Sequence, residues 1–282
     1  MNKRQPILSL RGVQVRFGGL LALDIKQIEM LDASGVSAIF MGPNGAGKST
    51  LYGALTGYVP VSRGSRITLN DGKNRELVGR SRAAVVRCGI ARTHQSPVFF
   101  PSLTVREGML LSTRMTRTCT WIRRRLSWLD FPGRNGRSGR LVDELIACLE
   151  LDAVADTRMA RLTLPLLRRA EIGRCMATQP RVVLLDEPSA GAALGETAFL
   201  VQCLGSVLPG LVRRLHSEGL YRHPQVAIGV ITHDLVLAEG LAKANGASPV
   251  VHVLNQGRLL MSASLDQVVG DARVQDIYLA RR

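Results

Sequence analysis

The sequence predicts an α/β fold, and three observations support this prediction. Short apolar runs rich in β-branched residues recur at 36–41, 181–185 and 226–231, as is typical of buried parallel strands. Segments with apolar residues at helical spacing separate these runs. The first run leads into a glycine-rich loop and then into a helical pattern, which completes the order strand, loop, helix of an α/β core.

The N-terminal part is expected to begin with strands. Residues 7–15 are rich in β-formers, and residues 36–41 form an apolar strand that ends at a glycine. Residues 50–56 carry apolar residues at helical spacing and predict a helix directly after the glycine-rich loop. Residues 66–70 precede an Asp-Gly pair, which predicts a strand that enters a turn.

The middle of the chain, from about 102 to 162, lacks strand patterns and predicts a helical insertion. Residues 141–151 carry leucines and an isoleucine at helical spacing. Three arginines at 123–125 and a Gly- and Arg-rich stretch at 132–140 predict an exposed helix end and a flexible loop.

The C-terminal part returns to the α/β pattern. A helix is expected at 168–178, before the strand at 181–185. The strand at 226–231 follows, then a strand pair within 250–260 and a closing helix at 265–279. No internal repeat is visible in the sequence.

Length and composition favour one large domain of a soluble, intracellular protein. The 282 residues are 46% hydrophobic, which is enough for a substantial core. We find no unbroken apolar stretch of about 18 residues, and the first residues are too polar for a secretory signal. The five cysteines form no C-x-x-C pair, so neither a disulfide framework nor a zinc site is expected.

The formal charge of +15 raises the question of a polyanionic partner. Clustered Lys and Arg bind nucleic acid and acidic lipid. Most of the excess is arginine, however, which a base-composition bias of the coding DNA would also produce. We therefore do not expect nucleic acid to be a partner.

The motif with the most specific chemistry is Gly42-x-x-x-x-Gly47-Lys48-Ser49. Glycines let backbone N–H groups surround phosphates, Lys48 would reach the β- and γ-phosphates, and Ser49 would ligate magnesium. The candidate nucleotide-binding residues are Gly42, Pro43, Asn44, Gly45, Ala46, Gly47, Lys48, Ser49 and Thr50. The sequence thus predicts a P-loop NTPase core that binds ATP and Mg²⁺.

Two carboxylates follow the apolar strand that ends at Leu185. Asp186 lies where a P-loop enzyme needs an acid to hold magnesium, and Glu187 could orient or deprotonate the attacking water. An Asp-Glu pair at a strand end is by itself commonly a surface turn. The P-loop upstream makes the catalytic interpretation the better one.

The sequence GPNGAGKST, with LLDEP about 140 residues later, resembles the ABC-transporter ATPase family over nearly the whole chain. The resemblance implies three further roles. Gln95 would contact magnesium and water, His233 would contact the γ-phosphate, and Phe17 would stack on adenine. Each of these residue types, taken alone, is more often a satisfied polar group or a core residue.

Other stretches resemble one branch of that family, the ATPases of branched-chain amino-acid importers and of urea and amide importers. These stretches are 91–95 with 100–105, 171–180, 255–257 and 271–279. The resemblance implies ATP hydrolysis that drives the import of branched-chain or other amino acids, with urea or amide import as the alternative.

One segment departs from the family. Where the signature Leu-Ser-Gly-Gly-Gln is expected, the chain has Leu162-Thr163-Leu164-Pro165-Leu166. Pro165 has no N–H, so a backbone donor to the γ-phosphate is lost. Because each signature completes the site of the other subunit, the resemblance favours a heterodimer with an intact-signature ATPase over a homodimer. A non-catalytic regulatory subunit is the alternative that this segment leaves open.

The resemblance implies a single ABC nucleotide-binding domain over 1–282. Its P-loop core, with an antiparallel β edge, would comprise about 1–95 and 171–282, and a helical subdomain would occupy about 96–170. Membrane-spanning permease subunits and a second ATPase subunit would be the partners, with the chain peripheral on the cytoplasmic face of the membrane. An ABC protein acting on nucleic acid is disfavoured because we find neither sustained heptads nor a second P-loop.

Overall fold

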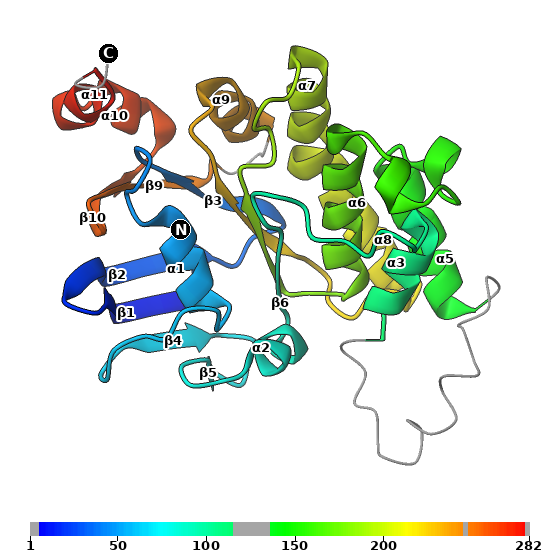
Figure 1. Ribbon diagram of the computed structural model, residues 1–282, viewed down its shortest axis with the longest axis horizontal. Helices are drawn as coiled ribbons and strands as arrows, with labels where there is room; N and C mark the ends of the chain where they lie inside the picture. Colours follow the sequence, from blue (N-terminus) through cyan, green and yellow to red (C-terminus); the bar gives the residue numbers. More distant parts are fainter. Residues whose placement is uncertain (1–5, 115–135, 245–247, 280–282) are drawn as a thin grey trace.

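The computed structural model describes residues 6–114, 136–244 and 248–279, which form one mixed sheet covered by helices (Figure 1). Within these residues the sheet has ten strands in the order β5-β4-β1-β2-β10-β9-β3-β8-β7-β6. The strands are β1 Pro6–Phe17, β2 Leu20–Leu31, β3 Gly35–Met41, β4 Arg66–Leu69, β5 Arg75–Glu76, β6 Ile90–Arg92, β7 Val182–Asp186, β8 Ala227–Ile231, β9 Val250–Asn255 and β10 Arg258–Ala263. The predicted α/β class is confirmed.

The strands β9, β3, β8, β7 and β6 form the parallel half of the sheet. Every residue of β3, β7 and β8 is buried, which explains why these three strands appear in the sequence as continuous apolar runs. Their carboxyl ends lie at one edge of the sheet. Loops that follow different strands are therefore brought together at that edge.

The strands β1, β2, β4 and β5 form an antiparallel half, as predicted for the N-terminal part. Buried and more exposed residues alternate over much of β1 and β2, because one face of the hairpin packs on the core. A single parallel pair, Arg258 with Asp24, joins β10 to β2 and connects the two halves. The sequence did not reveal β2 as a separate strand.

Helices flank the sheet on both faces. They are α1 Lys48–Leu55, α2 Arg82–Cys88, α3 Val105–Ser112, α5 Arg137–Cys148, η1 Asp152–Val154, η2 Met159–Arg161, α6 Leu164–Ala177, α7 Leu194–Gln202, η3 Cys203–Val207, α8 Leu208–Ser217, α9 Leu235–Ala244, α10 Leu265–Gly270 and α11 Ala272–Leu279. Two separate clusters of buried apolar residues result. One includes α1 and the β1–β2 hairpin, and the other includes α3, α5, α6 and α8.

Between β6 and β7 the described residues contain helices joined by loops and no strand, apart from one isolated bridge, Thr104 with Arg158. In Figure 1, α3, α5 and α6 gather at the end of the molecule away from the β1–β2 hairpin. A capping box of Thr104 and Glu107 begins α3. The limits of a helical subdomain at 96–170 stay a prediction, and α6 runs through the proposed boundary without a break.

Two expectations need correction, and a third cannot be compared with the structure. The stretch 132–140 was expected to be a loop, yet α5 begins at Arg137, because Ser138 and Gly139 are small enough to be buried in its first turn. The closing helix at 265–279 is two helices, α10 and α11, which extended backbone at Asp271 separates. The arginines at 123–125 lie outside the described residues.

The helical stretch Leu194–Ser217 is, by length and composition only, apolar enough to cross a membrane. Half of its most apolar window is buried inside the fold, as in a core helix. The stretch is not an unbroken apolar run, since polar residues such as Glu196 and Gln202 interrupt it.

Candidate functional site

A cleft of about 490 Å³ lies beside the loop that joins β3 to α1. Residues from five separate parts of the chain line it. They are Leu20, Leu21, Ala22, Asn44, Gly45, Ala46, Gly47, Lys48, Ser49, Thr50, Gln95, Glu187, Gln256 and Gly257. Most of the predicted nucleotide-binding residues therefore face one cavity.

The loop 42–47 requires glycine at both of its ends. Gly42 has a φ of 145°, and a Cβ there would lie 2.2 Å from the carbonyl oxygen of Leu254. Gly47 has a φ of 96° at the N-cap of α1, where a Cβ would come within 3.2–3.3 Å of Leu23, Ala22 and Gly257. The backbone can take this tight path only without side chains at these positions.

Lys48, the first residue of α1, is folded back over this loop. Its Nζ donates to the carbonyl oxygens of Gly42 at 2.8 Å and Pro43 at 3.0 Å. Lys48 is only 6% exposed, so its charge is held close to the loop rather than in solvent. A fixed ammonium beside a helix N-terminus suits the phosphates of a nucleotide.

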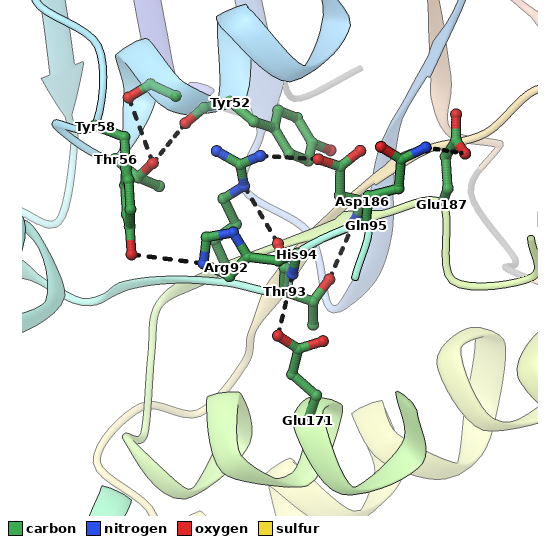
Figure 2. Close-up of polar contacts among 11 residues, drawn as sticks. Tyr52, Thr56, Tyr58, Arg92, Thr93, His94, Gln95, Glu171, Asp186 and Glu187 are labelled. Carbon is green, nitrogen blue, oxygen red and sulfur yellow. Dashed lines mark hydrogen bonds and ion pairs between the residues drawn. The ribbon is translucent and has the colours of Figure 1, made fainter. Parts of the chain in front are cut away.

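Glu187, Gln95 and His233 lie together, although they follow three different strands. Gln95 and Glu187 line the cleft, whereas His233 is not among the lining residues and contacts Glu187. The Gln95 Nε2 donates to Glu187 Oε2 at 3.2 Å (Figure 2). His233 Nδ1 lies 3.4 Å from Glu187 Oε1. Glu187 has a φ of 49°, which is strained for a residue with a side chain. Strain of this kind concentrates at functional sites, because surrounding structure must maintain it.

Asp186, which precedes Glu187, is buried and is not among the residues that line the cleft. It is 3% exposed and forms an ion pair with Arg92 Nη2 at 2.8 Å. Its backbone N–H donates to the hydroxyl of Thr93 at 3.0 Å, which ties β7 to the segment after β6 (Figure 2). Sequence reasoning missed Arg92, since its partner is distant in the chain.

The oxygen donors near the cleft fit a magnesium ion. Ser49 and Gln95 line the cleft and supply a hydroxyl and an amide oxygen, while Asp186 supplies a carboxylate whose second oxygen is not engaged by Arg92. Hydroxyl, amide and carboxylate oxygens are the ligands that Mg²⁺ prefers. The cradle at Gly42 and Gly47 and the buried Lys48 likewise fit the phosphates of ATP.

Phe17 is not among the residues that line the cleft. It lies at the end of β1 and is 52% exposed. The hairpin instead contributes Leu20, Leu21 and Ala22, which sequence reasoning did not select. Stacking of Phe17 on adenine stays a prediction.

The turn between β9 and β10 is a further part of the site that was not predicted. The Gly257 N–H donates to the carbonyl of Ala46 at 3.0 Å, and the Asp24 N–H donates to the carbonyl of Gly257 at 2.7 Å. Gln256 and Gly257 both have a positive φ. The turn thus connects the loop 42–47 to β2 through hydrogen bonds, and its Gln-Gly pair was the available sequence signal.

Burial alters the titration of two rings near Asp186. Complete burial raises the pKa of Tyr52 well above its ordinary value, and the Asp186 carboxylate adds to this rise. Burial, with the nearby Arg92 charge, lowers the pKa of His94. This shift favours the neutral form of the His94 ring, which packs edge-on against Tyr58.

The segment 162–166 lies away from the cleft lining, at the start of α6. Thr163 is the N-cap of this helix but makes no side-chain cap hydrogen bond, and Pro165 occupies the first turn. Proline is well tolerated there, since first-turn N–H groups have no partner within the helix. Pro165 is therefore compatible with an intact α6, but the helix N-terminus has one N–H fewer to donate.

Comparison with known proteins extends these observations. A family model described as ABC transporter matches residues 25–190. The high-affinity branched-chain amino acid transport ATP-binding protein LivG of Salmonella typhimurium is 32% identical over 278 residues, 98% of each chain. The corresponding protein BraF of Pseudomonas aeruginosa is 30% identical over 275 residues, again 98% of each chain.

Solved structures show the same fold. The ADP conformation of an ATP-binding cassette of an ABC transporter superposes with a TM-score of 0.74 at 23% identity, covering 98% of this chain and 100% of the other. A nucleotide-free cassette gives a TM-score of 0.73 at 22% identity, covering 97% and 99%. The arrangement of sheet and helices described above is thus that of an ATP-binding cassette.

Proposed function

We propose, on the premise that this chain belongs to the ABC transporter family, that it binds ATP in the described cleft and hydrolyses it to drive import. The observation that carries the proposal is that Gln95 and Glu187 line the same cleft as the loop residues 44–47, with His233 in contact with Glu187. A phosphate-binding loop and a water-orienting carboxylate must face each other for hydrolysis.

Each side chain has a distinct part in this proposal. Lys48 and the backbone N–H groups of the loop would hold the phosphates, and Ser49, Gln95 and Asp186 would hold magnesium. Bound magnesium would neutralise phosphate charge. Glu187 would orient the water and accept its proton.

Gln95 and His233 would orient the carboxyl group of Glu187. Gln95 Nε2 and His233 Nδ1 lie on different carboxylate oxygens of Glu187, so together they fix the plane of the carboxyl group. His233, with 55% of its side chain exposed, is also free to reach toward a γ-phosphate. This supports the roles that the family resemblance implies for both residues.

The cargo that we propose is a branched-chain or other amino acid. LivG and BraF, which match over nearly their whole lengths, carry branched-chain amino acid transport in their names. A urea or amide importer is the alternative within the same branch. Permease subunits would hold the chain at the cytoplasmic face of the membrane.

The segment 162–166 supports a heterodimer. In such a dimer an intact partner signature would complete the cleft described here, whereas Pro165 would leave the partner's cleft without one N–H donor. A homodimer would contain two incomplete sites. The same segment favours the second candidate function, a regulatory subunit that binds ATP without turnover.

Magnesium-dependent ATP hydrolysis distinguishes these functions. The purified chain would be assayed alone and mixed with an intact-signature partner ATPase, with Glu187→Gln as the control variant. We expect hydrolysis in the mixture that falls about 100-fold or more in Glu187→Gln, while ATP binding is retained. ATP binding without hydrolysis in either sample would contradict catalysis and support the regulatory function.

A further inference from the structure

One face of α6 carries three charged residues that contact the loops of the site. Arg168, Glu171 and Arg174 are spaced three apart, so they lie along the same side of the helix. Two loops receive their contacts, the segment 93–98 after β6 and the segment 187–190 after β7. We call these three residues the polar stripe of α6.

Glu171 makes the central contacts of the polar stripe. Its Oε1 accepts from the backbone N–H of His94 at 3.1 Å and from that of Val98 at 3.4 Å. Glu171 is only 6% exposed. A buried side-chain oxygen that accepts from two backbone N–H groups holds the loop at two points, and its removal would leave both donors without a partner.

The two arginines contact the loops on either side. Arg174 donates to the carbonyl oxygen of Val98, and Arg168 donates to the carbonyl oxygen of Ala190. The segment 93–98 is therefore held through both kinds of backbone group. The segment after β7 is attached to the same helix.

Gln95 lies between the backbone groups that Glu171 holds. Figure 2 shows Glu171 reaching from its helix to the His94 backbone, while the Gln95 side chain extends to Glu187. The position of Gln95 thus depends on where α6 places the segment. We propose that Glu171 is a positioning residue, which holds segment 93–98 on α6 so that Gln95 stays in contact with Glu187.

The contact of Glu171 with segment 93–98 would also couple the position of Gln95 to the start of α6. The helix begins at the segment 162–166, which the proposed function places against a partner subunit. Seven residues separate Leu164 from Glu171, which is about 10 Å along a helix. A shift of the helix start caused by the partner would therefore move Gln95 in this chain's own cleft.

The effect on hydrolysis rests on the proposed function, so the test has an arm that does not depend on activity. Hydrogen–deuterium exchange would be measured over 93–98 in Glu171→Leu, which keeps the buried volume, and in Glu171→Gln, which keeps an oxygen acceptor. Glu76→Leu is the matched control, because Glu76 also accepts two backbone N–H groups, from Ile67 and Val78, at the opposite edge of the sheet.

We expect exchange over 93–98 to be about tenfold faster in Glu171→Leu, close to wild type in Glu171→Gln and unchanged in Glu76→Leu. In the mixture with a partner, kcat should fall about tenfold in Glu171→Leu with ATP affinity unchanged, and Glu171→Gln should restore it. Glu171→Ala, which admits water to the two N–H groups, is the second variant if Glu171→Leu does not fold.

Two results would overturn the inference. One is unchanged exchange over 93–98 in the Leu and Ala variants, and the other is faster exchange with no change in kcat. If the wild-type mixture itself hydrolyses no ATP, the proposed function fails. The exchange measurement would then still decide whether Glu171 holds the segment.

Discussion

Lys48 illustrates how a single residue can be both structural and functional. Its ammonium group bridges the carbonyls of Gly42 and Pro43, so the loop has its shape before any phosphate arrives. A phosphate would meet a charge that is already positioned. Such preorganisation reduces the cost of binding.

Replacing Lys48 should therefore weaken ATP binding. We expect Lys48→Ala to raise the Kd for ATP about 10- to 100-fold, because hydrogen bonds to charged groups contribute about 1.5–3 kcal/mol. Equilibrium binding of a fluorescent ATP analogue measures this. Lys243→Ala, a lysine on α9 with 82% of its side chain exposed, is the control and should bind as the wild type does. Equal affinities in both variants would argue against a nucleotide site at this loop.

Glu171 should make stability depend on pH. Burial is the main cause that raises its pKa from 4.5 to about 7, against the opposing effects of the His94 and Val98 N–H groups and of Arg174 and Arg92. The folded state therefore binds a proton that the unfolded state has released between these two values. This contribution to stability is complete below pH 4.5 and is lost as pH rises through 7.

We expect Glu171→Gln to remove this dependence. The free energy of unfolding of the variant, relative to that of the wild type, should rise by roughly 3 kcal/mol between pH 4.5 and 7.5. Urea denaturation at several pH values measures the difference, with Glu76→Gln as the control. If the difference in unfolding free energy between variant and wild type stays constant across this pH range, the pKa of Glu171 is not raised in the folded protein.

At the residue scale the sequence predicted the residues whose motif is local. The run 42–50 and the pair after Leu185 were identifiable because spacing within the motif carries the chemistry. The contacts of Arg92 with Asp186 and of Glu171 with His94 join residues 94 and 77 positions apart. No local pattern reveals such pairs, since folding creates them.

The element that connects most parts of the site is α6. It starts at the altered signature segment, passes the two site loops with its polar stripe, and ends before β7. Pro165 fits its first turn, so the helix itself shows no damage. The only group lost is the backbone N–H at position 165, which could otherwise donate to a molecule bound at the helix N-terminus.

Restoring the backbone N–H at position 165 should increase ATP hydrolysis. We expect Pro165→Gly to raise ATP hydrolysis by the chain alone about tenfold, because one backbone donor is regained in each site of a homodimer. Glycine should also lower stability by about 1 kcal/mol through the unfolded state. Pro209→Gly, in the first turn of α8, is the matched control. No increase in hydrolysis would show that Leu166 or another residue limits the site.

At the element scale, periodicity identified the buried strands but not every boundary. The strands β3, β7 and β8 were found because burial on both faces makes them continuously apolar. The hairpin strand β2 was missed, since a strand with one exposed face is weakly marked in sequence. The break at Asp271 was missed because its neighbours continue a helical pattern.

The molecule as a whole has a formal charge of +15, most of it arginine. We expect no shift of RNA or DNA by the purified chain at about 0.15 M salt, where non-specific phosphate contacts are weakened. Electrophoretic mobility measured at several salt concentrations checks this. A salt-dependent shift that persists at that concentration would revive a role on nucleic acid.

The central claim is that the cleft at Lys48 and Glu187 is the place where this ATPase hydrolyses ATP. The most direct test is to measure hydrolysis by the mixed pair with a glutamine substitution in one subunit at a time. The account predicts that Glu187→Gln in this chain abolishes hydrolysis, whereas the equivalent substitution in the partner leaves most of it. Hydrolysis that survives Glu187→Gln here and disappears with the partner's substitution would contradict the account.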